Sequence, residues 1–101
     1  MAQTPYQQQA GNSYKHISTQ TTTVVKATGG VLRKVMVNSA TNGAAVTFYD
    51  NASAASGTVI AIYGLGSITT PQTAVEYNLT FTNGLTVLTA TQNADITITY
   101  T

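Results

Sequence analysis

The segment "AVEYNLTFTNGLTVLTATQNADITITYT" at 74–101 alternates apolar residues with threonine and other polar residues almost without a break. A period of two places alternate side chains on opposite faces of a β-strand, because successive Cβ atoms in a strand point to opposite sides. Helical spacing does not persist for two turns anywhere in the chain. The pattern therefore predicts an all-β protein whose strands have one apolar and one hydroxyl-rich face.

Similar runs recur from Tyr14 onward and are separated by turn residues such as Gly29-Gly30. The predicted strands are 14–19, 21–27, 31–38, 45–50, 58–63, 75–81, 85–91 and 95–100. Seven or eight short strands at a spacing of about ten residues are typical of a sandwich or a small barrel. We predict a single small antiparallel β-sandwich.

The first residues differ from the rest of the chain. Residues 1–13 are rich in glutamine, contain Pro5 and lack apolar periodicity, so we expect an extended or disordered N-terminal arm followed by a β-sandwich domain at 14–101. Tyr6 is an aromatic residue in this polar segment. Either the arm is a frayed terminus, or Tyr6 anchors it on a neighbouring subunit.

The break at Thr82-Asn83-Gly84 predicts a hairpin. A two-residue Asn83-Gly84 turn would place Leu85 on the polar face, because a one-residue slip moves every side chain to the other face. A three-residue loop with Gly84 as a left-handed bulge residue avoids this conflict. It would pair Phe81 with Leu85, and Leu79 with Val87.

Two further segments are candidates for subunit contact. The run "VLRKVMVN" at 31–38 is apolar on both faces, with Leu32 and Met36 on the second face, so the strand is either central or at an interface. The longest break, 64–73, contains Leu65 and Ile68 in a segment that should lie on the surface. These two residues either cap one end of the core or belong to a contact patch.

Charge is scarce in this chain. Charged residues make up 7% of the sequence, with four Lys or Arg and three Asp or Glu, whereas soluble domains average about 25%. All four basic residues precede position 35 and the three acidic ones follow it, which is either chance or a basic end that docks on an acidic surface. A net charge of +1 neutralises too few phosphates for nucleic-acid binding. The low charge density suits a protein that packs against neighbours.

The residue inventory argues against catalysis. The chain has no cysteine and one histidine, His16, so a zinc site would need two of three widely separated carboxylates. Asp50 and Asp95 fall at expected strand ends and are better explained as turn residues. "GLGS" at 64–67 lacks the lysine and helix of a phosphate loop. We therefore expect no enzyme activity, no cofactor, no metal and no small-molecule ligand.

No segment approaches the about 20 apolar residues of a transmembrane helix, and the sequence "MAQTPYQQQAGNSYK" has neither the basic nor the apolar region of a secretory signal. We therefore expect synthesis in the cytoplasm and no membrane partner.

The stretches "GGVLRKVMVNSATNGAAVTFYDNASAASGTVIAIYG" at 29–64 and "YNLTFTNGLTVLTATQNADITITYT" at 77–101 resemble small all-β virion proteins of tailed bacteriophages. The resemblance lies in a Gly-Val-Leu strand, a V-T-x-Y-D strand, an F-x-N-G-L-x-V segment and an A-D-I-T-I-x-Y ending, and it covers roughly residues 28–101. It implies a capsid cement or decoration protein on the virion surface. Its implied partners are the major capsid protein and copies of itself, with a trimer as the implied state.

The alternative within this resemblance is a tail-associated or head-fibre module that binds a receptor or carbohydrate. Exposed tyrosines stack on sugar rings in such modules. Tyr49 and Tyr63 stand where polar residues would be expected on their strands. If both lay on one open face, the carbohydrate-binding alternative would be favoured.

Overall fold

The computed structural model describes residues 12–67, 69 and 74–101. Eight strands and no helix lie within these ranges. The strands are β1 (Ser13–Ile17), β2 (Thr21–Lys26), β3 (Gly30–Ala40), β4 (Ala45–Tyr49), β5 (Val59–Gly64), β6 (Val75–Phe81), β7 (Leu85–Ala90) and β8 (Ala94–Tyr100). Every predicted strand is present, with its ends displaced by no more than two residues.

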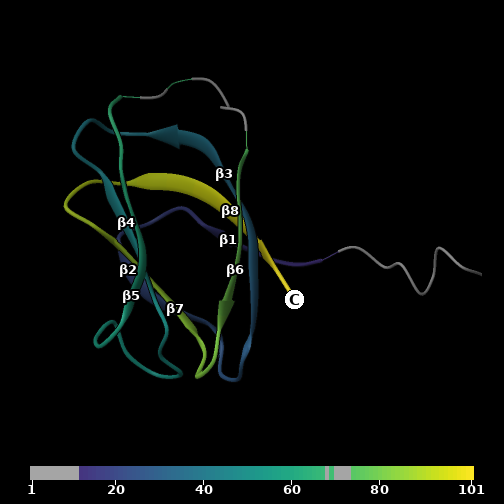
Figure 1. Cartoon of the computed structure of the whole chain (residues 1–101). Helices are drawn as coiled ribbons and strands as arrows, with labels where there is room; N and C mark the ends of the chain where they lie inside the picture. Colours follow the sequence, from purple (N-terminus) through teal and green to yellow (C-terminus); the bar gives the residue numbers. More distant parts are fainter. Residues whose placement is uncertain (1–11, 68, 70–73) are drawn as a thin grey trace, which may run out of the picture.

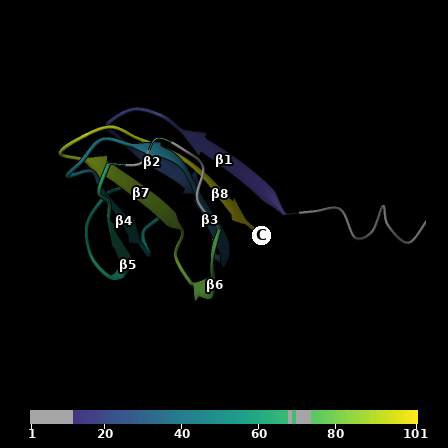
Figure 2. The same cartoon turned by 90° about the horizontal axis from the view of Figure 1, so that it is seen from above.

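The strands form two antiparallel four-stranded sheets. We call β1-β8-β3-β6 sheet A and β2-β7-β4-β5 sheet B, each in spatial order. The chain runs back and forth between the sheets (Figure 1). Seen from above, the two sheets stand side by side as two layers, with β1 and β2 at one end and β5 and β6 at the other (Figure 2). The predicted β-sandwich is thus confirmed.

Apolar side chains from both sheets fill the space between the layers. The largest of them, each at most 1% exposed, are Leu32, Val35, Val37, Phe81, Ile96 and Ile98 from sheet A, and Val46, Phe48, Leu85 and Val87 from sheet B. Burying such a side chain stabilises the fold by about 1.5–3 kcal/mol. Tyr77 of β6 reaches across to Phe48, with ring centroids 6.0 Å apart. Its burial raises the pKa of the phenol, and nearby Tyr63 adds to the effect.

The register of β3 corrects the prediction for Leu32. Relative to its neighbour β8, β3 carries one extra residue, Arg33, between Leu32 and Lys34. An inserted residue reverses the alternation of side chains along a strand. Leu32 therefore faces the core like Val35, and it is 0% exposed. The prediction that Leu32 shares an outer face with Met36 is wrong, and Leu32 has no surface to offer a partner.

The predicted hairpin at Thr82-Asn83-Gly84 is also wrong. β6 lies in sheet A and β7 in sheet B, so this segment crosses from one layer to the other. Phe81 and Leu85 are both fully buried, but each enters the core from its own sheet. The alternating pattern is the same for two strands that pair and for two that face each other across a core. The pattern alone therefore could not decide between them.

Position 84 requires glycine because neighbouring backbone atoms leave no room for a side chain. In the described ranges the glycines with positive φ are Gly43 and Gly57, which excludes the predicted left-handed conformation of Gly84. A Cβ on Gly84 would lie 2.6 Å from the Cα of Ala52 and 2.7 Å from the carbonyl oxygen of Lys26. Any side chain at Gly84 would therefore collide with backbone atoms.

Candidate protein-binding surface

The outer face of sheet B is made of threonine and apolar residues. One row of residues in register crosses it as Thr22, Leu88, Thr47 and Ile62, and the next as Val24, Thr86, Tyr49 and Val59. A third, shorter row is Ala90, Ala45 and Gly64. We call these residues the sheet B outer face.

Large apolar side chains are exposed on this face. Ile62 is 68% exposed, Val59 44% and Val24 42%. They come from the two edge strands, β5 and β2, and flank the half-buried Leu88 of the central strand β7. Exposed apolar patches mark sites of protein interaction. Here Ile62 and Val59 form one at the β5 edge, and Thr86, which is 0% exposed, lies between them and Val24.

No charged side chain of the described residues lies on the sheet B outer face, because the two charges nearest to it turn toward sheet A. A Cβ on Gly30 of β3 would lie 2.9 Å from the Nζ of Lys26, so the Lys26 side chain reaches across to sheet A. Asp50 follows β4 and turns toward the crossover at 82–84.

Asp50 binds the crossover segment through its carboxylate. It accepts hydrogen bonds from the backbone N–H groups of Thr82 at 3.0 Å, Asn83 at 2.8 Å and Gly84 at 3.3 Å. The Thr82 hydroxyl donates a further bond at 3.1 Å. These donors, led by the backbone groups of Thr82 and Asn83, hold the pKa of Asp50 below its ordinary value. The interpretation of Asp50 as a strand-end residue thus gains a definite role, which is to join the two sheets.

The outer face of sheet A, by contrast, carries charged and polar side chains beside the exposed Tyr14. Nε2 of His16 on β1 lies 2.6 Å from Oδ1 of Asp95 on β8, and the Asn38 amide on β3 donates to the same oxygen at 2.9 Å. The bond from Asn38, followed by that from His16, lowers the pKa of Asp95. Farther along, Nζ of Lys34 lies 4.0 Å from a carboxylate oxygen of Glu76. These interactions link β1, β8, β3 and β6 from one edge of sheet A to the other.

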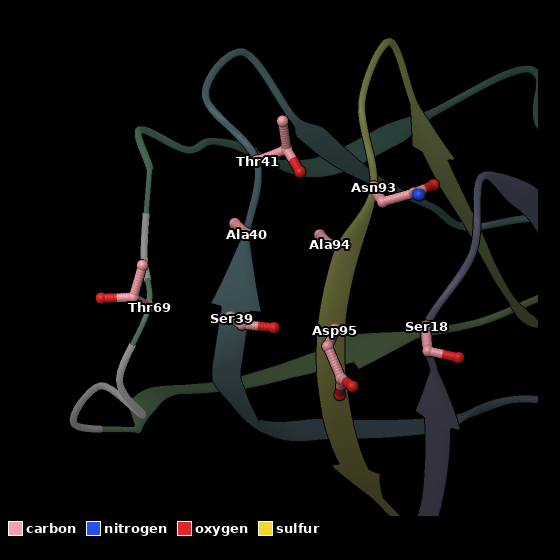
Figure 3. Close-up of a pocket in the computed structure, with 8 residues that line it drawn as sticks. All are labelled: Ser18, Ser39, Ala40, Thr41, Thr69, Asn93, Ala94 and Asp95. Atoms are coloured by element: carbon pink, nitrogen blue, oxygen red, sulfur yellow. The ribbon is translucent and has the colours of Figure 1, made fainter.

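A shallow pocket of about 430 Å³ lies beside this cluster, at one end of sheet A. Its lining comes from β3 and β8, the segments next to them and to β1, and the segment between β5 and β6. It comprises Ser18, Ser39, Ala40, Thr41, Thr69, Asn93, Ala94 and Asp95. Figure 3 shows Asp95 between Ser39 and Ser18, with small side chains around it. The pocket holds one carboxylate and several hydroxyls. The carboxylate is that of Asp95, which His16 and Asn38 contact from the neighbouring strands.

Within the described ranges no three His, Asp or Glu side chains come together in a metal-binding group. No helix there is long and apolar enough to cross a bilayer. Both findings concern only the residues that the structure describes.

The predicted contact residues that the structure describes, Leu32, Met36 and Leu65, lie in different parts of the molecule. Met36 is half-buried on the outer face of sheet A, opposite Thr97 of β8. Leu65 packs against the core, and its N–H donates to the Ala44 carbonyl at 2.8 Å, so of the two alternatives for Leu65 the structure shows the capping role. Tyr6 and Ile68 lie outside the described residues. The structure therefore does not bring Leu32, Met36 and Leu65, the predicted contact residues that it describes, together into one site.

Tyr49 and Tyr63 do not share a face. Tyr49 lies on the sheet B outer face, whereas Tyr63 is in register with buried Val46 and packs against the core. The open pair of tyrosines that would favour a carbohydrate-binding module is not formed.

The sheet B outer face was not predicted from the sequence, although the apolar residues that form it break the alternating pattern. The run "VIAIY" at 59–63 has apolar residues at every position of its strand, and Val24 and Leu88 break the Thr alternation on theirs. These positions become one surface only when β2, β7, β4 and β5 are placed side by side. That strand order is set by the tertiary structure.

Comparison with known proteins returns no matching family model, curated protein or solved structure.

Proposed function

We propose that this chain is a virion structural protein of a tailed bacteriophage, a capsid cement protein that binds the outer capsid surface through the sheet B outer face. The observation that carries the proposal is this uncharged face with its exposed Ile62, Val59 and Val24. The resemblance of 29–64 and 77–101 to phage virion proteins supplies the class of partner. The partners are then the major capsid protein and further copies of the chain.

The two outer faces suit this role differently. Protein interfaces have cores depleted of charge, because a charge that is buried without a partner is costly. The sheet B outer face meets this requirement as it stands. The outer face of sheet A, with His16, Lys34, Glu76 and Asp95, is suited to remain in water.

Stabilisation of a shell follows from mass action. A partner that binds only the folded, assembled form shifts the equilibrium toward that form. Each contact can be weak, because many identical contacts on one particle act together.

The proposal is tested by mixing purified protein with capsids assembled without it, followed by co-sedimentation and measurement of the capsid melting temperature. We expect the protein to sediment with the capsids and to raise that temperature. An unchanged melting temperature without co-sedimentation would refute the proposal.

A matched pair of variants identifies the binding face. Leu88→Lys places a charge at the centre of the sheet B outer face, and Met36→Lys does the same on the outer face of sheet A. Both residues are half-buried on central strands. We expect Leu88→Lys to lose capsid binding and Met36→Lys to keep it, with the melting curve of each free variant as the control for folding. The reverse result would assign binding to sheet A and to the predicted contact residue Met36.

A further inference from the structure

Among the edge strands of the described residues, β5 is the one least protected by charge. Free edges of a sheet offer unpaired backbone groups, and proteins commonly block them with charges or bulges. Of the four edge strands, β1 carries Lys15 and His16, β2 carries Lys26 and β6 carries Glu76. β5 has the sequence Val-Ile-Ala-Ile-Tyr-Gly, without charge or proline. It has one bulge, at Ile60, and in the described residues it pairs only with β4.

The backbone groups of β5 that point away from β4 can be assigned. Leu65, just after β5, donates its N–H to the Ala44 carbonyl and accepts from the Gly43 N–H, so its backbone faces the β4 side. Backbone direction alternates along an antiparallel strand. Ala61 and Tyr63 therefore also face β4. Ile62 and Gly64 present their N–H and C=O groups to the open side.

From this geometry we infer that two copies of the chain pair through β5, antiparallel and about a two-fold axis at Ile62, and so join their B sheets into one continuous sheet. This inference deepens the proposed function, because it names the contact between neighbouring copies on the capsid. It differs from the trimer that the resemblance implies.

The register follows from the faces of the side chains. With Ile62 opposite Ile62 of the second copy, Ala61 meets Tyr63 and Ile60 meets Gly64. Ala61 and Tyr63 both point toward the core side, so faces match across the junction. A register centred on Ala61 would place Val59 of one copy opposite Tyr63 of the other. These two residues lie on different faces of the sheet, because β5 has an extra residue between Ala61, which pairs with Phe48, and Val59, which pairs with Tyr49. Centring on Ile62 places the core-packed Ile60 opposite Gly64, which has no side chain to oppose it, and uses the outward groups of both Ile62 and Gly64.

Of the four edge strands of a second copy, β5 is the one that fits best against β5. Pairing β5 with β1, β2 or β6 of another copy would bring Lys15, Lys26 or Glu76 against an uncharged strand. When β5 pairs with β5 of the second copy, the two Ile62 side chains, each 68% exposed in the single chain, lie beside one another. It also makes the two sheet B outer faces continuous. The contact is small against the about 1,200 Å² of stable interfaces, so we expect a weak pair in free solution.

A disulfide trap detects such a pair, and the chain has no cysteine of its own. Directly opposed residues with hydrogen-bonded backbones have Cα atoms about 5.5 Å apart, which a disulfide can bridge. We expect Ile62→Cys, oxidised at high protein concentration without capsids, to form a covalent dimer on a non-reducing gel. Tyr14→Cys on edge strand β1, where Tyr14 is 69% exposed, is the matched control and should remain monomeric.

Val59→Cys on the same strand tests the register. Val59 is 44% exposed but lies off the two-fold axis, so it should cross-link less than Ile62→Cys. Equal cross-linking of Ile62→Cys and Tyr14→Cys would overturn the β5 pairing, and equal cross-linking of Val59→Cys and Ile62→Cys would overturn the register. Failure of the trap while wild-type protein still binds capsids would refute only this inference. Wild-type protein that fails to bind capsids, while Ile62→Cys still forms the covalent dimer, would refute only the cement function.

Discussion

Sheets A and B present similar apolar side chains to a shared core but carry different outer faces. Sheet A uses Ile96 and Ile98 inside and His16, Asn38 and Asp95 outside. Sheet B uses Val46, Phe48 and Val87 inside, and its outer face has threonine and exposed aliphatic residues without charge. Because both inner faces bury apolar side chains in the same core, the stability of the fold does not require the two outer faces to differ. We attribute it to what each outer face contacts.

The largest expected effect tests the similarity of the inner faces. Phe81→Ala in sheet A and Phe48→Ala in sheet B, both 0% exposed in the native protein, should each destabilise the fold by about 3–5 kcal/mol. Chemical denaturation measures the loss. If these variants do not fold, the milder pair Val35→Ala and Val46→Ala serves the same purpose. A much smaller loss in one sheet would show that the sheets do not share one core equally.

The second prediction concerns the crossover that joins the sheets. Gly84→Ala should cost about 1–3 kcal/mol, because its Cβ overlaps backbone atoms. Gly84→Asn should cost at least as much, since space and not φ is limiting. Gly64→Ala, where a Cβ meets no atom within 4 Å, is the control. Tolerance of asparagine at Gly84 would restore the left-handed turn predicted from the sequence.

Asp50 gives the third prediction, on the same junction. Asp50→Asn should lower the free energy of unfolding by about 1 kcal/mol at neutral pH, modest because the carboxylate is solvent-accessible. The pKa of Asp50 is lower in the folded state than its ordinary 3.8. Its contribution is therefore present above that value and is lost as pH falls through the folded pKa.

Denaturation of wild type and Asp50→Asn across pH checks this expectation. The difference between them should shrink in acid. Glu76→Gln, which removes an exposed carboxylate from sheet A, is the control for loss of a surface charge. A constant difference at all pH values would contradict the proposed role of the Asp50 carboxylate.

The smallest expected effect sharpens the description of the polar face. His16 and Asp95 are 52% and 34% exposed at their side chains, and such pairs contribute about 0–1 kcal/mol. A double-mutant cycle with His16→Ala and Asp95→Asn should give a coupling energy in that range, reduced by added salt. Because the pKa of Asp95 is lowered, its contribution should also disappear in acid. A coupling well above this range would mean that the outer face of sheet A is structurally required.

Strand positions were predictable and strand pairing was not. The eight strands, the burial of Ile96 and Ile98 and the role of Asp50 at a strand end followed from alternation and turn residues. The errors at Leu32 and at Thr82-Asn83-Gly84 both arise from features that the local pattern does not show. A single inserted residue, or a change of sheet, leaves the local pattern almost unchanged and alters which residues face each other.

The sequence by itself determined that the chain forms short strands with one apolar face, because the period of two is a local property of the backbone. It also determined the scarcity of charge and of catalytic groups. Only the tertiary structure decided that β6 and β7 face each other across the core and that Gly84 is needed for space. It likewise gathered Val24, Leu88, Val59 and Ile62 on one uncharged face. These features depend on contacts between residues far apart in the chain, which local alternation does not encode.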